Sequence, residues 1–190
     1  MMGNVPATAD WKTITKQSLP VLLGAVVIGV LSGQILVWYQ DRLFAIPVLL
    51  ALVPAVNGIG GNVGSILGAR VASGLHIGSL WSHGGRGFGR DVTASVLLTI
   101  ITFSFLGFLA SAMSPLLGLE SPISMAELVL TTLIAGLGLI LVMILLVVVV
   151  GVLAHRYGWD PDNTIVPVLT TAGDTLGILF LLIAGGLVGL

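Results

Sequence analysis

Five long apolar stretches constrain this chain more than any other feature of its sequence. They cover residues 19–38, 45–72, 93–119, 128–154 and 165–190. A helix needs about 20 apolar residues to cross the hydrocarbon core of a bilayer, and the alternating ten-residue segments of a membrane barrel do not occur in the chain. The sequence therefore predicts an all-α integral membrane protein with five transmembrane helices.

Composition agrees with this class and excludes several functions. Hydrophobic residues make up 56% of the chain and charged residues 8%, against about 25% charged residues in soluble domains. The chain has no cysteine, which excludes disulfides and thiolate metal sites. Its net charge of −1 gives no reason to expect nucleic acid as a partner. We expect a multi-pass protein of the cell membrane, with a cytoplasmic segment at residues 1–18 and one transmembrane domain at residues 19–190.

The basic residues predict how the helices are oriented. If the chain crosses the membrane five times, six of its seven basic residues lie on one side of the membrane and only Arg42 lies on the other. Because lysine and arginine in short loops are retained on the cytoplasmic side, the N-terminus should be cytoplasmic and the C-terminus outside. The six are Lys12, Lys16, Arg70, Arg86, Arg90 and Arg156.

Polar residues predict where three of the helices begin. We expect Asp91 to cap the third span, and Asp162 or Asn163 to cap the fifth. Ser124 and Glu127 have the spacing of a capping box before the fourth span. This fourth span is almost wholly aliphatic, so we expect it to face chiefly lipid.

The second span is unusually rich in helix-weakening residues. Proline removes a backbone amide and each glycine weakens a helix by up to about 1 kcal/mol, so we expect this helix to be kinked or broken. The alternative is that the glycines only allow close helix packing. The amides of Asn57 and Asn62 favour a role in lining a pathway, because lipid offers them no hydrogen-bond partner.

Asp174 is the only carboxylate in the fifth span and lies near its middle. Placing a charged side chain there costs about 2.5–3.5 kcal/mol, so such residues usually face water or bind a cation. Thr170, Thr171 and Asp174 are three and four residues apart, which predicts one polar helix face. Since no Lys, Arg or His lies in the middle of any span, a bound cation is the best partner for Asp174.

The donors available at this depth are all oxygens, which favours Mg²⁺, Ca²⁺, Mn²⁺ or Na⁺ over Zn²⁺ or Cu⁺. Mg²⁺ keeps several of its waters and is often held by one or two carboxylates, so it is the leading candidate. Backbone carbonyls near Val56 and Asn57 are expected to complete its outer shell. We expect no organic cofactor.

Two motifs resemble those of the MgtE-type magnesium transporters and of their eukaryotic relatives in solute carrier family 41. The second span contains PAVNGIGGNVGS at residues 54–65, and the fifth carries DPDN at residues 160–163, followed by Pro167, Thr170, Thr171, Gly173 and Asp174. The resemblance covers nearly the whole chain from about residue 19. It implies a five-helix domain that pairs with a second copy around a cation pore, in which Asp174 coordinates the ion and Asn57 and Asn62 lie on the facing helix.

The sequence also departs from that family. Bacterial members carry a large cytoplasmic Mg²⁺-sensing region, to which nothing here corresponds, and eukaryotic members carry two membrane domains in one chain. We therefore expect a homodimer, with regulation by the sensor in doubt.

The sequence is compatible with several functions. We expect a Mg²⁺ transporter or channel, and the alternatives are an exchanger that couples Mg²⁺ to Na⁺ or H⁺ and a noncatalytic assembly subunit. An intramembrane hydrolase is disfavoured because the spans lack the paired catalytic groups that it needs, so we expect no enzymatic activity.

Asp160 and Asp162 have two interpretations of equal weight. They either form a cation site at the cytoplasmic mouth or stabilise a turn and cap the helix that follows it. The glycine-rich segment 84–90 is interpreted as a linker, because it lacks the residues of a phosphate-binding loop. His76 and His83 are interpreted as ordinary loop residues.

Overall fold

The computed structural model describes residues 11–78, 86–119 and 123–190, and every regular element within these ranges is helical. Five of the helices are long and apolar enough to cross a membrane, which confirms the all-α, five-span prediction for the described residues. They are α1 (Trp11–Trp38), α3 (Pro47–His76), α4 (Arg86–Met113), α5 (Met125–Tyr157) and α6 (Pro161–Val188). The short helix α2 (Gln40–Ala45) joins α1 to α3, and a 3-10 turn, η2 (Pro115–Leu117), follows α4.

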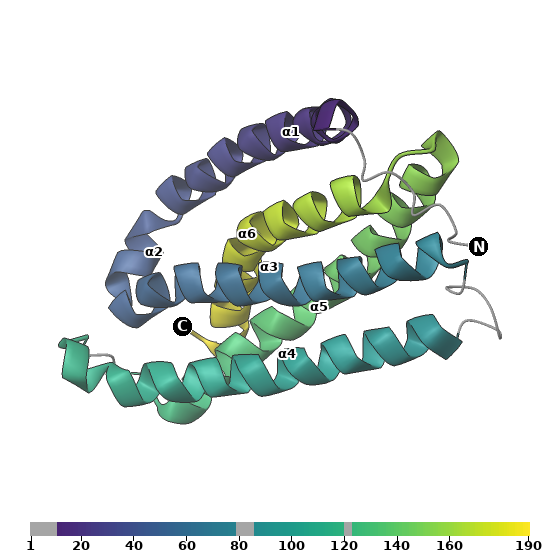
Figure 1. The fold of residues 1–190 in the computed structure, drawn as a ribbon. Coiled ribbons are helices and arrows are strands. Elements are labelled where there is room, and N and C mark those ends of the chain that lie inside the picture. The colour runs from purple at the N-terminus through teal and green to yellow at the C-terminus, as the bar shows by residue number, and fades with distance from the viewer. Residues whose placement is uncertain (1–10, 79–85, 120–122) are drawn as a thin grey trace, which may run out of the picture.

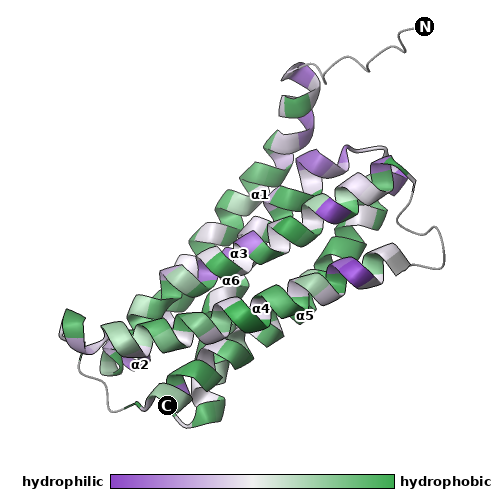
Figure 2. Ribbon diagram, turned by 60° about the horizontal axis from the view of Figure 1, so that its bottom comes forward, coloured by the Kyte–Doolittle hydropathy of each residue, from purple (hydrophilic) through white to green (hydrophobic). Residues whose placement is uncertain are grey.

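The helices form a bundle in which α6 lies between α1 and the other long helices (Figure 1). Helix α3 packs against α4, α5 and α6, whereas among the long helices α1 packs only against α6. The hydrophilic residues gather mainly toward the helix ends, most clearly at the end where α1 begins (Figure 2). This distribution fits a membrane-embedded bundle, while the cytoplasmic placement of that end stays a prediction.

Helix α5 is more central than its aliphatic sequence suggests. The expectation that this span faces chiefly lipid is wrong, since it packs against α3, α4 and α6. Gly136 lies directly against the ring of Phe103, and the hydroxyl of Thr132 donates to the Phe103 carbonyl over 2.8 Å. The physical reason is that apolar side chains suit a lipid-facing and a protein-facing surface equally well.

Helix α3 runs without interruption from Pro47 to His76, with Pro54 inside it. The expected break is therefore not found, and the kink stays a prediction. The glycines instead allow neighbouring side chains to approach, as the packing alternative requires. A Cβ atom at Gly60 would overlap a methyl group of Leu139, and one at Gly64 would lie 3.2 Å from the Met143 sulfur. These contacts bring α3 close to α5.

The predicted N-terminal cap is found at α5, whereas α6 is capped by a different residue from those predicted. Ser124 and Glu127 form the expected capping box at α5. At α6 the cap is Asp160 rather than Asp162 or Asn163, because its side chain accepts from the Asp162 amide.

The predicted cap of the third span is wrong. Asp91 lies inside α4, which begins at Arg86, and it accepts from Arg70 at 2.9 Å instead of capping the helix. The first span also starts earlier than its apolar stretch indicates. Helix α1 begins at Trp11, within the segment assigned to residues 1–18, and residues 1–10 lie outside the described ranges.

Candidate cation site

Asp174 lies halfway along α6, and its side chain is exposed at the surface of the single chain. The ion pairs among the described residues join Arg70 to Asp91 and His76 to Asp160 and Asp162, and none of them reaches Asp174. Within the part of the chain that the structure describes, this carboxylate therefore has no basic partner.

Beside Asp174 the backbones of α3 and α6 come into direct contact. A Cβ atom at Gly173 would overlap the Gly61 Cα and lie 2.5 Å from the Gly61 nitrogen, which only a glycine avoids. The two helices run antiparallel through this point, since Asn57 meets Gly177 on one side and Ser65 meets Thr170 on the other. The glycine pair therefore sets the distance between the two helices at the depth of Asp174.

Two exposed residues of α3 lie away from its contact with α5. Gly60 and Gly64 face α5, whereas Gly58 and Asn62 are exposed. Each of these exposed residues is two positions from a glycine that faces α5, which places it about 160° away around the helix.

Exposed polar residues of α6 lie beside them. Leu169 is fully buried, whereas Thr170 and Asp174, one helical turn apart, are both exposed. Because Thr170 contacts Ser65, this flank of α6 adjoins α3. We call the exposed residues Gly58, Asn62, Thr170 and Asp174 the outer α3/α6 face.

Thr170 is tied to both helices. Its hydroxyl donates to the Val166 carbonyl over 3.0 Å, so in its 2.8 Å contact with Ser65 the Ser65 hydroxyl must be the donor. The Thr170 oxygen keeps a further lone pair that can accept from a water molecule. The hydrogen bonds fix this oxygen one helical turn from Asp174.

Asn57 lies in the helix contact rather than on the outer face. A Cβ at Gly177 would overlap its side-chain oxygen, so that oxygen points at the α6 backbone. The oxygen is buried and accepts no hydrogen bond within the described part of the chain. A buried acceptor without a partner costs about 1–3 kcal/mol, which makes Asn57 a candidate for contact with water or with a hydrated ion.

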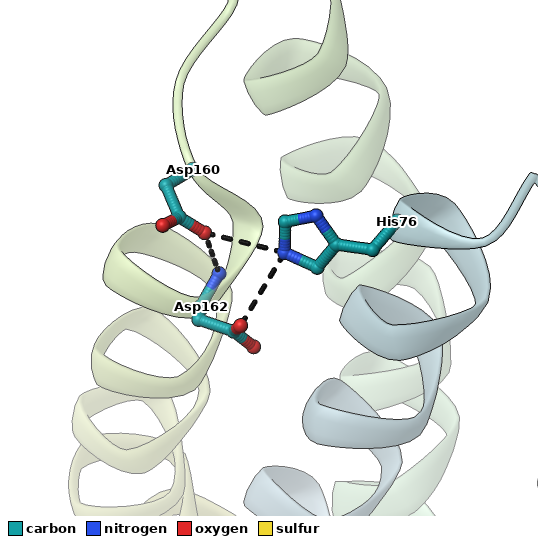
Figure 3. A group of neighbouring side chains, drawn as sticks. All are labelled: His76, Asp160 and Asp162. Atoms are coloured by element: carbon teal, nitrogen blue, oxygen red, sulfur yellow. Dashed lines mark hydrogen bonds and ion pairs between the residues drawn. The ribbon is translucent and has the colours of Figure 1, made fainter. Parts of the chain in front are cut away.

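A second group of donors lies where α3 ends and α6 begins (Figure 3). The His76 Nε2 atom lies 3.4 Å from Asp160 Oδ1 and 3.3 Å from Asp162 Oδ2. We call these three residues the mouth cluster.

The sequence by itself indicates only part of the mouth cluster. It indicates both aspartates as candidates, but the interpretation of His76 as an ordinary loop residue is wrong, because His76 is the last residue of α3. His83 lies outside the described ranges. The antiparallel order of the second and fifth spans is the signal that would have placed His76 and the aspartates at one end.

Comparison with known proteins identifies the family. Residues 53–184 match the profile of the MgtE family, described as divalent cation transporters. The chain belongs to the MgtE family. It is also similar to solute carrier family 41 member 3 of Rattus norvegicus, with 27% identity over 184 aligned positions, and the match covers 90% of this chain and 38% of that protein. The chain thus spans less than two thirds of that relative's length. No solved structure matches the chain.

The region that matches the MgtE family contains all the expected ligands, but the structure does not gather them all on one face. Thr171 donates to the Pro167 carbonyl and lines a groove of about 450 Å³ between α1 and α6. The Val56 side chain is fully buried, and its carbonyl lies within the unbroken part of α3. The outer α3/α6 face holds Asp174, Thr170 and Asn62, and Asn57 lies just behind it.

Proposed function

We propose that this multi-pass membrane protein moves Mg²⁺ across the bilayer, with Asp174 as the central ligand. The observation that carries the proposal is an exposed carboxylate at mid-helix, on a polar face, without a cationic partner in the described chain. Membership of a divalent cation transporter family supports the general activity. The choice of Mg²⁺ and of this site is our own inference.

The donor set of the outer α3/α6 face suits a hydrated ion. It offers one carboxylate, one amide and one hydroxyl, from Asp174, Asn62 and Thr170, and no imidazole or thiolate. Mg²⁺ loses its waters reluctantly and is often held through one or two carboxylates with waters retained. We place Asp174 against those waters, with Asn57 as an additional acceptor.

We also propose that a second copy of the chain covers the outer α3/α6 face. In a single chain Asp174 would point toward lipid, at a cost of about 2.5–3.5 kcal/mol. Two copies that meet with these faces inward would enclose the carboxylates in a shared aqueous pathway and present two acids to one ion. We therefore propose a homodimer whose pathway runs along its axis.

Transport then follows from electrostatics and geometry. A hydrated ion reaches the cytoplasmic or outer end of the pathway and is drawn to the two Asp174 carboxylates. Its waters donate to Asp174, Thr170 and Asn62, and the ion leaves down its gradient. Asp160 and Asp162 would raise the local cation concentration at the end of the pathway where they lie.

Flux in proteoliposomes tests the proposed function. We expect purified protein to carry Mg²⁺ down its gradient well above the rate of empty liposomes, with slower flux of Ca²⁺ and Mn²⁺. A channel needs no opposing gradient, whereas an exchanger would require Na⁺ or H⁺ on the other side. Flux of none of these ions under any gradient would contradict the proposal and favour a noncatalytic assembly subunit.

Cysteine crosslinking tests the proposed pairing, because the chain contains no cysteine. Gly58 lies on the outer α3/α6 face with open space around it, so Gly58→Cys should give an oxidised dimer in membranes. Asn62→Cys, on the same face, should do the same. The matched control is Leu141→Cys on α5, a residue that is 67% exposed but lies on a different helix. Dimers of the Leu141 variant alone would contradict the proposed interface.

A further inference from the structure

We propose that the mouth cluster of His76, Asp160 and Asp162 is a binding site for a transition-metal cation such as Zn²⁺, Co²⁺ or Ni²⁺, separate from the site at Asp174. The three residues come from two helices that are distant in the sequence, and their side chains point toward one another (Figure 3). This site goes beyond the proposed Mg²⁺ transport and does not depend on it.

The positions of the donor atoms suit a single ion. One nitrogen of His76 and one oxygen of each aspartate all lie within 4.8 Å of one another. With metal–nitrogen and metal–oxygen bonds of about 2.0–2.2 Å, an ion placed between them would need only small side-chain adjustments. The side chains are half-exposed to exposed, so an ion could reach them from water.

The net negative charge of the mouth cluster favours binding of a cation. For each aspartate, the ion pair found within the described residues is with His76. A histidine ring carries at most one positive charge, so two carboxylates leave the cluster negative in either state of the ring. A divalent cation would neutralise this charge and would leave the imidazole free to act as a ligand.

The surrounding hydrogen bonds hold Asp160 in place. Its side chain accepts from the Asp162 amide over 3.0 Å, and its own amide donates to the Gln17 side chain of α1. The side-chain amide of Asn163 donates to both Gln17 and Asp160. Such outer contacts orient metal ligands and commonly change affinity by about 10–100-fold. The N-terminus of α6 is thereby fixed against α1, with Asp160 facing α3.

A cavity beside the cluster leaves room for the remaining ligands. It has a volume of about 390 Å³, and its lining includes His76, Asp160 and His155. Three protein donors leave coordination positions open, and water can fill them from this cavity. The imidazole distinguishes this site from the one at Asp174, because a nitrogen ligand favours Zn²⁺, Co²⁺ and Ni²⁺ over Mg²⁺.

Binding of a metal here would join the end of α3 to the start of α6. These are the two helices whose contact carries the outer α3/α6 face. A bound ion would therefore restrain the spacing of the proposed pathway at one of its ends.

Co²⁺ titration of the full chain in detergent, without a polyhistidine tag, tests the site. The protein should carry Asp174→Asn to remove the mid-membrane carboxylate, and the buffer should contain Mg²⁺ to occupy oxygen-only sites. We expect one Co²⁺ per chain, seen by visible absorption and by calorimetry. His76→Ala should weaken binding at least about tenfold, and Asp160→Asn and Asp162→Asn should weaken it similarly.

Two matched variants serve as controls in the same background. His155→Ala removes a histidine that lines the same cavity but is not one of the three donors, and Asp41→Asn removes an exposed acid in α2. Both should keep the Co²⁺ affinity of the protein that carries Asp174→Asn alone. Absence of Co²⁺ binding in that protein, or equal affinity after His76→Ala, would overturn the proposal. Because Asp174 is already replaced, these outcomes are independent of whether the protein transports Mg²⁺.

Discussion

Replacing Asp174 by asparagine is expected to reduce Mg²⁺ flux in proteoliposomes to the rate of empty liposomes. The substitution keeps the shape of the side chain but removes the charge that would attract the ion. In the proposed dimer it also relieves the repulsion between two carboxylates that share one pathway. Thermal unfolding in detergent should therefore show a stability equal to or above that of the parent. Loss of flux without loss of stability is the result that a functional ligand predicts.

Asp41→Asn is the matched control for this variant, because Asp41 is an exposed acid in α2, away from the outer α3/α6 face. It should keep parental flux. An Asp174→Asn protein that transports Mg²⁺ at the parental rate would show that Asp174 is not the central ligand.

Replacing Gly173 by alanine is expected to separate α3 from α6. The new Cβ would overlap the Gly61 Cα, and a backbone atom cannot move aside as a flexible side chain can. Overpacking of this kind costs about 1–3 kcal/mol. We expect a lower unfolding temperature in detergent and a loss of flux, because the same contact positions Asp174 against α3.

Two other glycines provide the comparison. Gly186 lies on the same helix, and apart from the backbone of that helix no atom lies within 4 Å of the position that a Cβ would take. Gly186→Ala should therefore leave stability and flux unchanged or slightly raise stability. In Gly61→Ala the nearest atom to the new Cβ, the Thr170 carbonyl oxygen, would lie 3.4 Å away, so the effect should be milder than at Gly173. Equal effects at Gly173 and Gly186 would contradict the importance of the contact.

Much of the candidate site can be predicted from residue types and spacing. Asp174 is conspicuous because a lone acid in an apolar helix is costly, and Thr170 follows from its distance of four residues along the same helix. The same spacing argument assigns Thr171 to that face, but the structure places it in the groove beside α1. The spacing of two residues on one helix does not say which neighbouring helix each of them meets.

The mouth cluster, too, can be predicted only in part from the sequence. Its two aspartates are visible as a motif, while His76 joins them only after α3 and α6 are packed together.

The amino-acid sequence alone is enough to predict five membrane helices and an acidic residue in the middle of the last one. Hydrophobic length and the cost of a buried charge are properties of single segments, so no neighbour is needed to see them. Helix packing, in contrast, established that α5 is central, that Gly173 touches Gly61, and that His76 meets Asp160 and Asp162. These facts depend on which faces of different helices meet, and an apolar face has the same composition whether it meets lipid or protein.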